Sequence, residues 1–418
     1  MVINMSGKQK PLIRFKGFTE AWEQRKLSYI YQNIGNAFVG TATPYYVDVG
    51  HFYLESNNIK DGKINRNNEI FINDEFYEKQ KDKWLHTGDM VMVQSGHVGH
   101  TAVIPEELNN SVAHALIMFR NPKVKIDPYF LNYQYQTINA KKKIDNITTG
   151  NTIKHILASD IQNFTIDIPK IEEQQKIADY FLKLDYLITL HQRKLEKLKN
   201  IKKSCLEKMF PNNGKKIPEI RFSGFTEAWE QRKVTEIGKI YIGLVTTMTK
   251  YYTEDGTLLI RNSDIKDGRF EFGANPIYLE KSFAQKNESR MHQLGDVITV
   301  HTGDVGTSAV ITENEVKSIG FATIVTRPNQ EIIDSNYLCS FLNTDKHKKW
   351  AVGVSTGDGR TNYNLGNYYE LIVPVPSVKE QQKITTFIQK LNCLITLHQR
   401  KLEKLKNIKK SMLEKMFV

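Results

Sequence analysis

The chain has 418 residues and an excess of basic over acidic side chains, 58 Lys and Arg against 46 Asp and Glu, for a formal net charge of +12. Its 40% hydrophobic content excludes global disorder, and its three cysteines exclude a disulfide framework. There is no apolar run long enough to cross a membrane and no apolar segment typical of a secretory signal in the first ten residues, so we expect a cytoplasmic protein. The basic excess fits a polyanionic partner without establishing one.

The sequence is a tandem repeat. Residues 13–26, IRFKGFTEAWEQRK, recur at 220–233 with one difference, and residues 187–210 recur at 394–417 with Met412 in place of Cys205. The chain is therefore two copies of one unit, with nearly identical ends and divergent middles. Gene duplication followed by drift would spread the differences evenly. Segregated differences instead favour a shared structural role for the ends and two versions of a variable role for the middles.

In the first copy, an N-terminal extension (1–12) precedes a domain at 13–168. Short β-branched runs at 90–93, 101–104 and 116–119 predict strands of a mixed or antiparallel sheet, and the pattern over 128–143 predicts a helix. From residue 169 to 210, apolar residues spaced alternately four and three apart predict one long helix with a heptad seam. Such a helix would be roughly 60 Å long.

The second copy follows a linker at 211–219 and has the same order. A domain at 220–375, with a predicted helix over 335–350, precedes a second long helix at 376–418. The predicted fold class is α+β, with two tandem globular domains separated by two long helices that pair as an antiparallel coiled coil with pseudo-twofold symmetry. The alternative is two independent helices that each recruit another chain. The apolar seam residues expected in pairing or subunit docking are Ile177, Phe181, Leu184, Ile188, Leu195, Leu198, Ile384, Ile388, Leu391, Ile395, Leu402 and Leu405.

Catalytic signatures are missing from the sequence. There is no phosphate-binding G-x-x-x-x-G-K-[ST] loop, no G-x-G-x-x-G, no H-E-x-x-H and no G-x-S-x-G, and the three cysteines are too isolated for a zinc site. We therefore expect a non-catalytic binding module with no cofactor or metal of its own.

Three pairs of polar loops recur at matching places in the two copies: 94–100 with 301–307, 148–154 with 355–362, and 57–63 with 262–269. Glycines allow close backbone approach, while free amides, small hydroxyls and nearby basic residues suit phosphate oxygens or guanine edges. An ordinary tight hairpin is the alternative for each glycine-rich loop.

With these features the chain resembles the specificity subunits of type I restriction–modification systems. The matching motifs are R-F-x-G-F-x-x-x-W at 14–22 and 221–229, G-D followed by [ST]-G-x-x-G, P-x-x-x-E-Q-x-x-I at 169–177 and 376–384, and the long Leu/Lys helix that ends each copy. The resemblance covers nearly the whole chain.

The resemblance implies that each variable domain reads one half of a bipartite sequence in double-stranded DNA, and that the helices set the gap between the half-sites. It also implies docking of two methyltransferase subunits, which bind S-adenosylmethionine, and of two restriction subunits, which use ATP. Neither cofactor is expected on this chain.

The resemblance also directs the choice of candidate DNA-binding residues. They are Lys60, Lys63, Ser95, Gly96, His97, Asn151, Thr152, Lys154, Lys266, Arg269, Thr302, Gly303, Asp304, Arg360 and Asn362. Asp304 could accept from cytosine N4 and Arg360 could pair with guanine. His97 occupies the position of Asp304, so the two domains should read different half-sites. We expect Trp22 and Trp229 to be core or helix-docking residues rather than residues that stack on bases. Two alternatives are a coiled-coil scaffold with two protein-binding domains and a nuclease with an unrecognised site.

Overall fold

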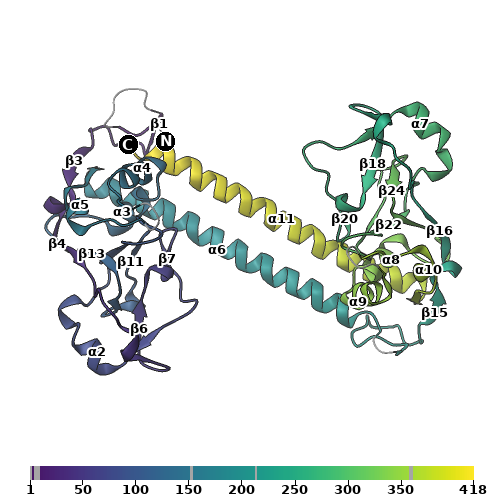
Figure 1. Ribbon diagram of the computed structural model, residues 1–418, viewed down its shortest axis with the longest axis horizontal. Coiled ribbons are helices and arrows are strands. Elements are labelled where there is room, and N and C mark those ends of the chain that lie inside the picture. The colour runs from purple at the N-terminus through teal and green to yellow at the C-terminus, as the bar shows by residue number, and fades with distance from the viewer. Residues whose placement is uncertain (1, 4–9, 151–153, 212–213, 357–360) are drawn as a thin grey trace. The chain divides into compact units, whose positions relative to one another are not determined.

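The computed structural model describes residues 2–3, 10–150, 154–211, 214–356 and 361–418 (Figure 1). The chain divides into two compact units. Unit 1 comprises Met1–His191 and Arg400–Val418, and unit 2 comprises Gln192–Gln399. Each unit thus holds one domain, the start of the long helix that follows that domain, and the end of the long helix of the other copy.

Two four-stranded sheets form the domain of unit 1. The first is antiparallel in the order β11-β10-β13-β4, and the second has the order β12-β6-β9-β5 with β12 parallel to β6. The strands of the first sheet are β4 (Tyr31–Asn36), β10 (Met90–Val93), β11 (Thr101–Val103) and β13 (Leu116–Pro122). Those of the second are β5 (Tyr46–Val47), β6 (His51–Leu54), β9 (Phe71–Ile72) and β12 (Val112–Ala113). All four residues of the inner strand β10 are buried, as its β-branched and methionine side chains favour.

Smaller elements complete unit 1. Its remaining strand pairs are β1 (Val2–Ile3) with β2 (Ile13–Arg14), β3 (Glu23–Lys26) with β14 (Thr165–Ile168), and the hairpin β7 (Ile59–Lys60) with β8 (Lys63–Ile64). Its helices are α1 (Leu27–Ile30), α2 (Asp74–Glu78), α3 (Pro128–Gln134), α4 (Ile138–Asn146), α5 (Ala158–Asn163) and the start of α6 (Ile171–Lys208).

Unit 2 repeats this arrangement, which confirms the predicted α+β class. Its sheets have the orders β16-β25-β22-β23 and β17-β21-β18-β24. Its strands are β15 (Glu230–Lys233), β16 (Gly238–Ile242), β17 (Tyr252–Thr253), β18 (Thr257–Arg261), β19 (Ile265–Lys266), β20 (Arg269–Phe270), β21 (Tyr278–Leu279), β22 (Val297–Thr299), β23 (Ser308–Val310), β24 (Ile319–Phe321), β25 (Ile324–Pro328) and β26 (Ile372–Val375). Its helices are α7 (Lys281–Lys286), α8 (Ser335–Leu342), α9 (Asp345–Val354), α10 (Leu365–Tyr369) and the start of α11 (Val378–Met416).

The single helices predicted over 128–143 and 335–350 are each two helices instead. A buried threonine interrupts each one: Thr137 has an extended backbone, and its side chain accepts from the amide of Ala140 at the start of α4. Thr344 does the same for α9. The helical spacing of apolar residues continues through both breaks, so it does not reveal them. The signal in the sequence for a new helix start is the threonine itself, a favoured N-cap residue.

The long helices are antiparallel where they meet within each unit. In unit 1 the ring centroids of Phe417 and Phe181 are 5.9 Å apart. Lys409, about two turns before Phe417, pairs with Asp185, about one turn after Phe181, so the two helices run in opposite directions. Figure 1 shows this end of α11 beside α3 and α4. The predicted antiparallel pairing is therefore confirmed, and the alternative of independent helices is not.

Burial along the predicted seam depends on position. The residues at the start of each helix are all buried, namely Ile177, Phe181, Leu184, Ile188, Ile384, Ile388 and Leu391. All of these except Ile188 and Leu391 belong to a domain core. The later ones, Leu195, Leu198, Ile395, Leu402 and Leu405, are half-buried. The ends of the helices are buried again, because Leu206, Met209 and Phe210 join the core of unit 2 and Leu413, Met416 and Phe417 join that of unit 1.

Candidate nucleic-acid interface

Two repeated sequence motifs meet at the start of each long helix. In unit 1 the guanidinium of Arg14 donates to both carboxylate oxygens of Glu173 at 2.6 Å, and both residues are buried. In unit 2 Arg221 makes the same pair with Glu380 at 2.7 and 2.8 Å. Because a bidentate pair has a defined geometry, the two motifs hold each helix start against its domain.

The glutamine of the same motif adds a second link. The Gln174 side chain accepts from the amide of Asp127 at 2.9 Å and donates to the carbonyl of Pro169 at 2.8 Å. Gln381 makes the equivalent pair of bonds in unit 2. The invariant part of each copy is therefore a frame that carries the variable domain.

Both tryptophans belong to the frame, as predicted. Trp22 and Trp229 are each 1% exposed. Trp22 packs edge-on against Phe417 at 6.1 Å, and Trp229 packs edge-on against Phe210 at 6.3 Å. Each aromatic therefore joins a domain to the end of the long helix from the other copy.

A cavity opens beside each ion pair of the frame. Its volume is about 590 Å³ in unit 1 and about 490 Å³ in unit 2. The equivalent segments 17–21 and 224–228 line the two cavities, and they are identical in sequence. The two units thus present nearly the same concave surface at the start of α6 and of α11.

The glycine-rich loop of unit 1 joins β10 to β11. Gly96 and Gly99 adopt φ of 79° and 83°, which glycine tolerates far better than other residues. A Cβ on Gly99 would lie 2.9 Å from Ile144, whereas a Cβ on Gly96 would meet nothing within 4 Å. The loop is therefore packed on α4 at one end, while its tip, which includes the exposed His97, faces open space.

The structure brings this loop together with the second predicted loop. Ser95 forms a β-bridge with His155, and the amide of Gly96 donates to the carbonyl of Lys154 at 3.2 Å. The exposed residues of both segments thus share one surface. The amide of Gly96 is occupied within the protein, so the expectation that this glycine amide is free for phosphate is wrong.

The equivalent loops of unit 2 are joined in the same way. Thr302 forms a β-bridge with Asn362, and its hydroxyl donates to the side-chain oxygen Oδ1 of Asn362 at 3.0 Å. The Asp304 carboxylate accepts from the Thr307 hydroxyl at 2.7 Å, which holds its exposed side chain at the tip. Gly303, with φ of 100°, forms the turn between them.

The third pair of loops forms the hairpins β7–β8 and β19–β20. In unit 2 it is bonded to the glycine-rich loop through Asn262, whose side chain accepts from the amide of His301 at 2.8 Å. The same side chain donates to the carbonyl of Ala322, between β24 and β25, at 3.1 Å. In unit 1 the link is the amide of Asp61, which lies 3.3 Å from the ring of His100. The sequence had singled out the segment that contains Asn262 but not this residue.

Several candidate DNA-binding residues have partners within the protein. Lys154 pairs with Asp145 at 3.0 Å, and Arg269 pairs with Glu271. The amine of Lys63 lies 3.8 Å from Asp185 on α6, on the helix side of its hairpin. Lys60 and Lys266 are exposed. Asn151, Thr152 and Arg360 lie outside the described residues. The whole set remains a prediction.

Burial changes the titration of histidines beside the loops. Desolvation lowers the pKa of His301 and of His100, so both are mainly neutral at pH 7. Among the described residues, no group of three or more His, Cys, Asp or Glu side chains could hold a metal ion. Within the same part of the chain, no helix is both long and apolar enough to span a membrane.

Comparison with known proteins matches both repeats. The family model of the type I restriction modification DNA specificity domain covers residues 17–200 and 226–407. The MjaVIII specificity subunit of a type I restriction enzyme of Methanocaldococcus jannaschii is 21% identical over 381 residues, which is 86% of this chain and 84% of that protein.

Solved structures share the fold over nearly the whole chain. The type I S subunit from M. genitalium superposes with a TM-score of 0.61 at 14% identity and covers 98% of this chain and 99% of its own. A chain from a study of complex assembly and conformational transition of the type I R-M system gives a TM-score of 0.54 at 16% identity, with coverage of 95% and 97%. This chain therefore belongs to the family of type I restriction–modification specificity proteins and carries two copies of its DNA specificity domain.

Proposed function

We propose that the chain is the non-catalytic specificity subunit of a type I restriction–modification complex, and that each unit recognises one half of a bipartite site in double-stranded DNA. One observation carries this proposal. The loops that differ between the copies lie at equivalent places in both units, on frames built from identical residues. Two different readers on one framework suit a target with two different halves.

Within each unit, the proposed DNA-contacting surface consists of the glycine-rich loop and the loop bridged to it. Its tip carries His97 in unit 1 and Asp304 in unit 2, both exposed. A carboxylate can accept from cytosine N4, whereas an imidazole ring can donate a hydrogen bond. Differing chemistry at the same position is what would make the two half-sites differ.

Replacing His97 by alanine should relax recognition at one half-site, and replacing Asp304 by alanine should relax it at the other. A direct base contact would change discrimination by about 1–3 kcal/mol, or roughly 5- to 150-fold. The measurement is genome-wide mapping of methylated adenines after co-expression of the full chain with a methyltransferase subunit. If both substitutions weakened all sites uniformly, these side chains would be phosphate contacts. If the assembled complex bound no DNA at low salt, the protein-binding scaffold would be the better description.

The partner subunits are also part of the proposal. Leu187 and Leu190 in unit 1 and Leu394 and Leu397 in unit 2 are 38–44% exposed, and they belong to the identical helix segments. The frame cavities are repeated in the same way. Identical surfaces suit two copies of one partner, which we take to be the methyltransferase subunit that binds S-adenosylmethionine. Two restriction subunits, which use ATP, would complete the complex.

The long helices would set the spacing between the two half-sites. Inserting seven residues before Leu195 and before Leu402 preserves the heptad register and lengthens each helix by about 10.5 Å, or roughly three base pairs. The methylated motif should keep both half-sites and gain a longer spacer. The same insertion after Gly214, in the linker, serves as the control and should leave the spacer unchanged. A spacer that did not respond to the helix insertions would contradict this role.

A further inference from the structure

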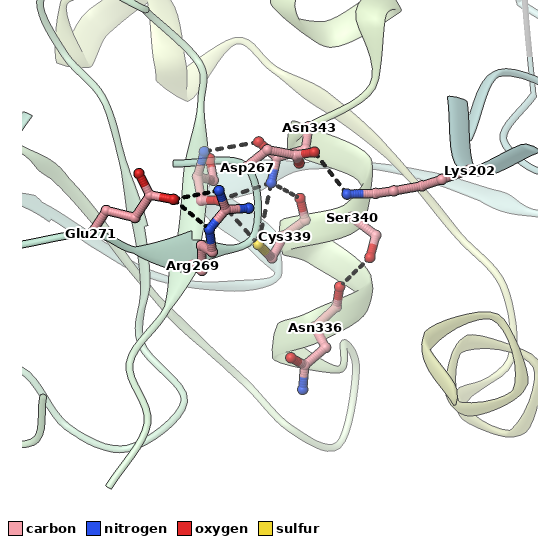
Figure 2. Close-up of polar contacts among 9 residues, drawn as sticks. Lys202, Asp267, Arg269, Glu271, Asn336, Cys339, Ser340 and Asn343 are labelled. Atoms are coloured by element: carbon pink, nitrogen blue, oxygen red, sulfur yellow. Dashed lines mark hydrogen bonds and ion pairs between the residues drawn. The ribbon is translucent and has the colours of Figure 1, made fainter. Parts of the chain in front are cut away.

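The two long helices carry the same lysine near their ends, but this lysine has different partners in the two units. In unit 1, the amine of Lys409 lies 2.8 and 3.0 Å from the two carboxylate oxygens of Asp185 on α6, and 3.3 Å from the side chain of Gln136. In unit 2, the amine of Lys202 lies 2.7 Å from Asp267, at the tip of the β19–β20 hairpin. Figure 2 shows Lys202 extending toward this hairpin.

Two differences between the copies explain the change of partner. The position of Asp185 is occupied in α11 by Asn392, so unit 2 has no helix carboxylate there. In unit 1 the hydroxyl of Tyr133 also donates to Asp185 at 2.8 Å. In unit 2 the position of Tyr133 is occupied by Ser340, whose hydroxyl donates to the carbonyl of Asn336 within α8 (Figure 2). The lysine of unit 2 therefore pairs with the hairpin carboxylate. The side chain of Lys202 is 13% exposed and that of Asp267 is 44% exposed, so solvent screens the pair in part.

The hairpin is in turn bonded to the strand that follows the glycine-rich loop. The amide of Gly268 donates to the carbonyl of Ser308 at 3.0 Å, and the Ser308 hydroxyl donates to the carbonyl of Gly306 at 3.0 Å. Asn343 secures the same backbone from the other side through bonds of 2.8 and 3.0 Å to the carbonyl and amide of Ser308. Ser308 is fully buried. A continuous set of polar contacts thus leads from α6 to the loop that carries Asp304.

We propose that Lys202 is a positioning residue for the recognition surface of unit 2. Through Asp267 it fixes the β19–β20 hairpin, and through Gly268 and Ser308 it fixes the glycine-rich loop. The equivalent lysine of unit 1 does not pair with its hairpin directly, because Asp185 holds it on the helix, and the hairpin of unit 1 approaches the same carboxylate through Lys63 instead. The DNA part of the inference rests on the function proposed above, whereas the link from helix to hairpin to loop does not.

Hydrogen exchange on the purified full chain tests the link without DNA. Replacing Lys202 by methionine should speed exchange of the amides of 265–271 and 306–308 by about two- to fivefold and leave unit 1 unchanged. Asp267→Asn should have the same effect, and the double variant should add little to either. Lys202→Arg should retain protection. Lys199→Met, an exposed position on the same helix, is the matched control. Unchanged exchange in Lys202→Met would overturn the link.

A substitution that copies unit 1 gives a sharper test. Asn392→Asp supplies the helix carboxylate that unit 2 lacks, so Lys202 should leave Asp267 and the same amides should exchange faster, although the lysine and the hairpin are both intact. Faster exchange would support the explanation that a helix carboxylate at the position of Asp185 selects the partner of the lysine. Unchanged exchange would show that the helix carboxylate does not select the partner of the lysine, and would overturn it.

Mapping of methylated adenines then tests the consequence for recognition. Lys202→Met should degrade only the half-site that Asp304→Ala degrades, with recovery in Lys202→Arg. If recognition were lost at both half-sites together, or at neither of them, the positioning role would be overturned even if hydrogen exchange is faster. If the wild-type complex methylates no bipartite site, the proposed function fails, while the exchange experiment still decides whether Lys202 fixes the hairpin and the loop.

Discussion

Replacing Glu173 by alanine should lower the free energy of unfolding of unit 1 by about 3–5 kcal/mol, because the guanidinium of Arg14 would remain buried without its carboxylate partner. Arg14 is 5% exposed and Glu173 is 1% exposed, so water cannot replace the lost bonds without a rearrangement. The pair joins the first motif of the repeat to the start of α6, so its loss should also weaken the contact between domain and helix. Calorimetry of the full chain and hydrogen exchange of unit 1 measure the two effects.

The neighbouring residue provides a matched control for this prediction. Glu172 is exposed on the same turn, and Glu172→Ala should change stability by less than about 0.5 kcal/mol. The double substitution Arg14→Met with Glu173→Leu should recover much of the loss, because it leaves no unpaired buried charge. Glu380→Ala should act on unit 2 as Glu173→Ala acts on unit 1. If Glu173→Ala cost no more than Glu172→Ala, the ion pair would contribute nothing to the frame.

Unit 2 should lose stability in mild acid because it contains two buried neutral histidines. Burial lowers the pKa of His292 and of His347 to about 4, against 6.5 for an ordinary histidine. Between these values the unfolded chain binds protons that the folded unit does not, so stability is full above pH 6.5 and falls as the pH drops toward 4. At pH 5 the loss is about 2 kcal/mol for each histidine.

Unit 1 serves as an internal comparison for this pH dependence. The equivalent positions are Leu85 and Ala140, and both are buried. Burial raises the pKa of Asp89 and of Asp167, and a raised carboxyl pKa favours the folded state as the pH falls, the opposite sign to the histidines. His100 acts in the same direction as the histidines of unit 2, but it is only half-buried. Unit 1 should therefore change less between pH 7 and pH 5.

Hydrogen exchange of the full chain at pH 7 and pH 5, corrected for the intrinsic rate, measures both units in one sample. His292→Leu and His347→Ala, which copy unit 1, should each flatten the pH dependence of unit 2 even if they lower its stability at pH 7. Equal losses in the two units, or an unchanged slope in the double variant, would mean that other groups govern the response to acid.

The sequence predicted the large-scale organisation because that organisation is encoded locally. Two long helices followed from apolar spacing, and the repeat followed from identity at a constant offset. The three loop pairs could also be located, since glycine and small polar residues mark turns wherever they occur. Their contacts with one another were not predicted, because the Ser95–His155 and Thr302–Asn362 bridges are long-range contacts that spacing does not specify.

The partners of polar side chains were harder to predict from the sequence, because a polar group binds whatever the fold brings within reach. Lys63 and Arg269 are basic residues of the hairpin loops, which suggested contacts with DNA, and each lies beside a carboxylate of its own chain. The amide of Gly96 looked free because it lies in a glycine-rich loop, but Lys154 lies opposite it. The breaks at Thr137 and Thr344 were visible in sequence, but only as single residues within an otherwise helical pattern.

The sequence by itself determined two copies of a domain and helix, the invariant frame and the positions of the variable loops. These features depend on periodicity and identity along the chain. Only the tertiary structure decided which carboxylate each repeated lysine pairs with. Lys202 and Lys409 lie in the same sequence context. Lys409 pairs with Asp185 on the other helix, more than 200 residues away, whereas Lys202 faces Asn392 at the equivalent position and pairs with the hairpin instead. Opposite charges select their partners by distance and burial, and the folded chain sets both.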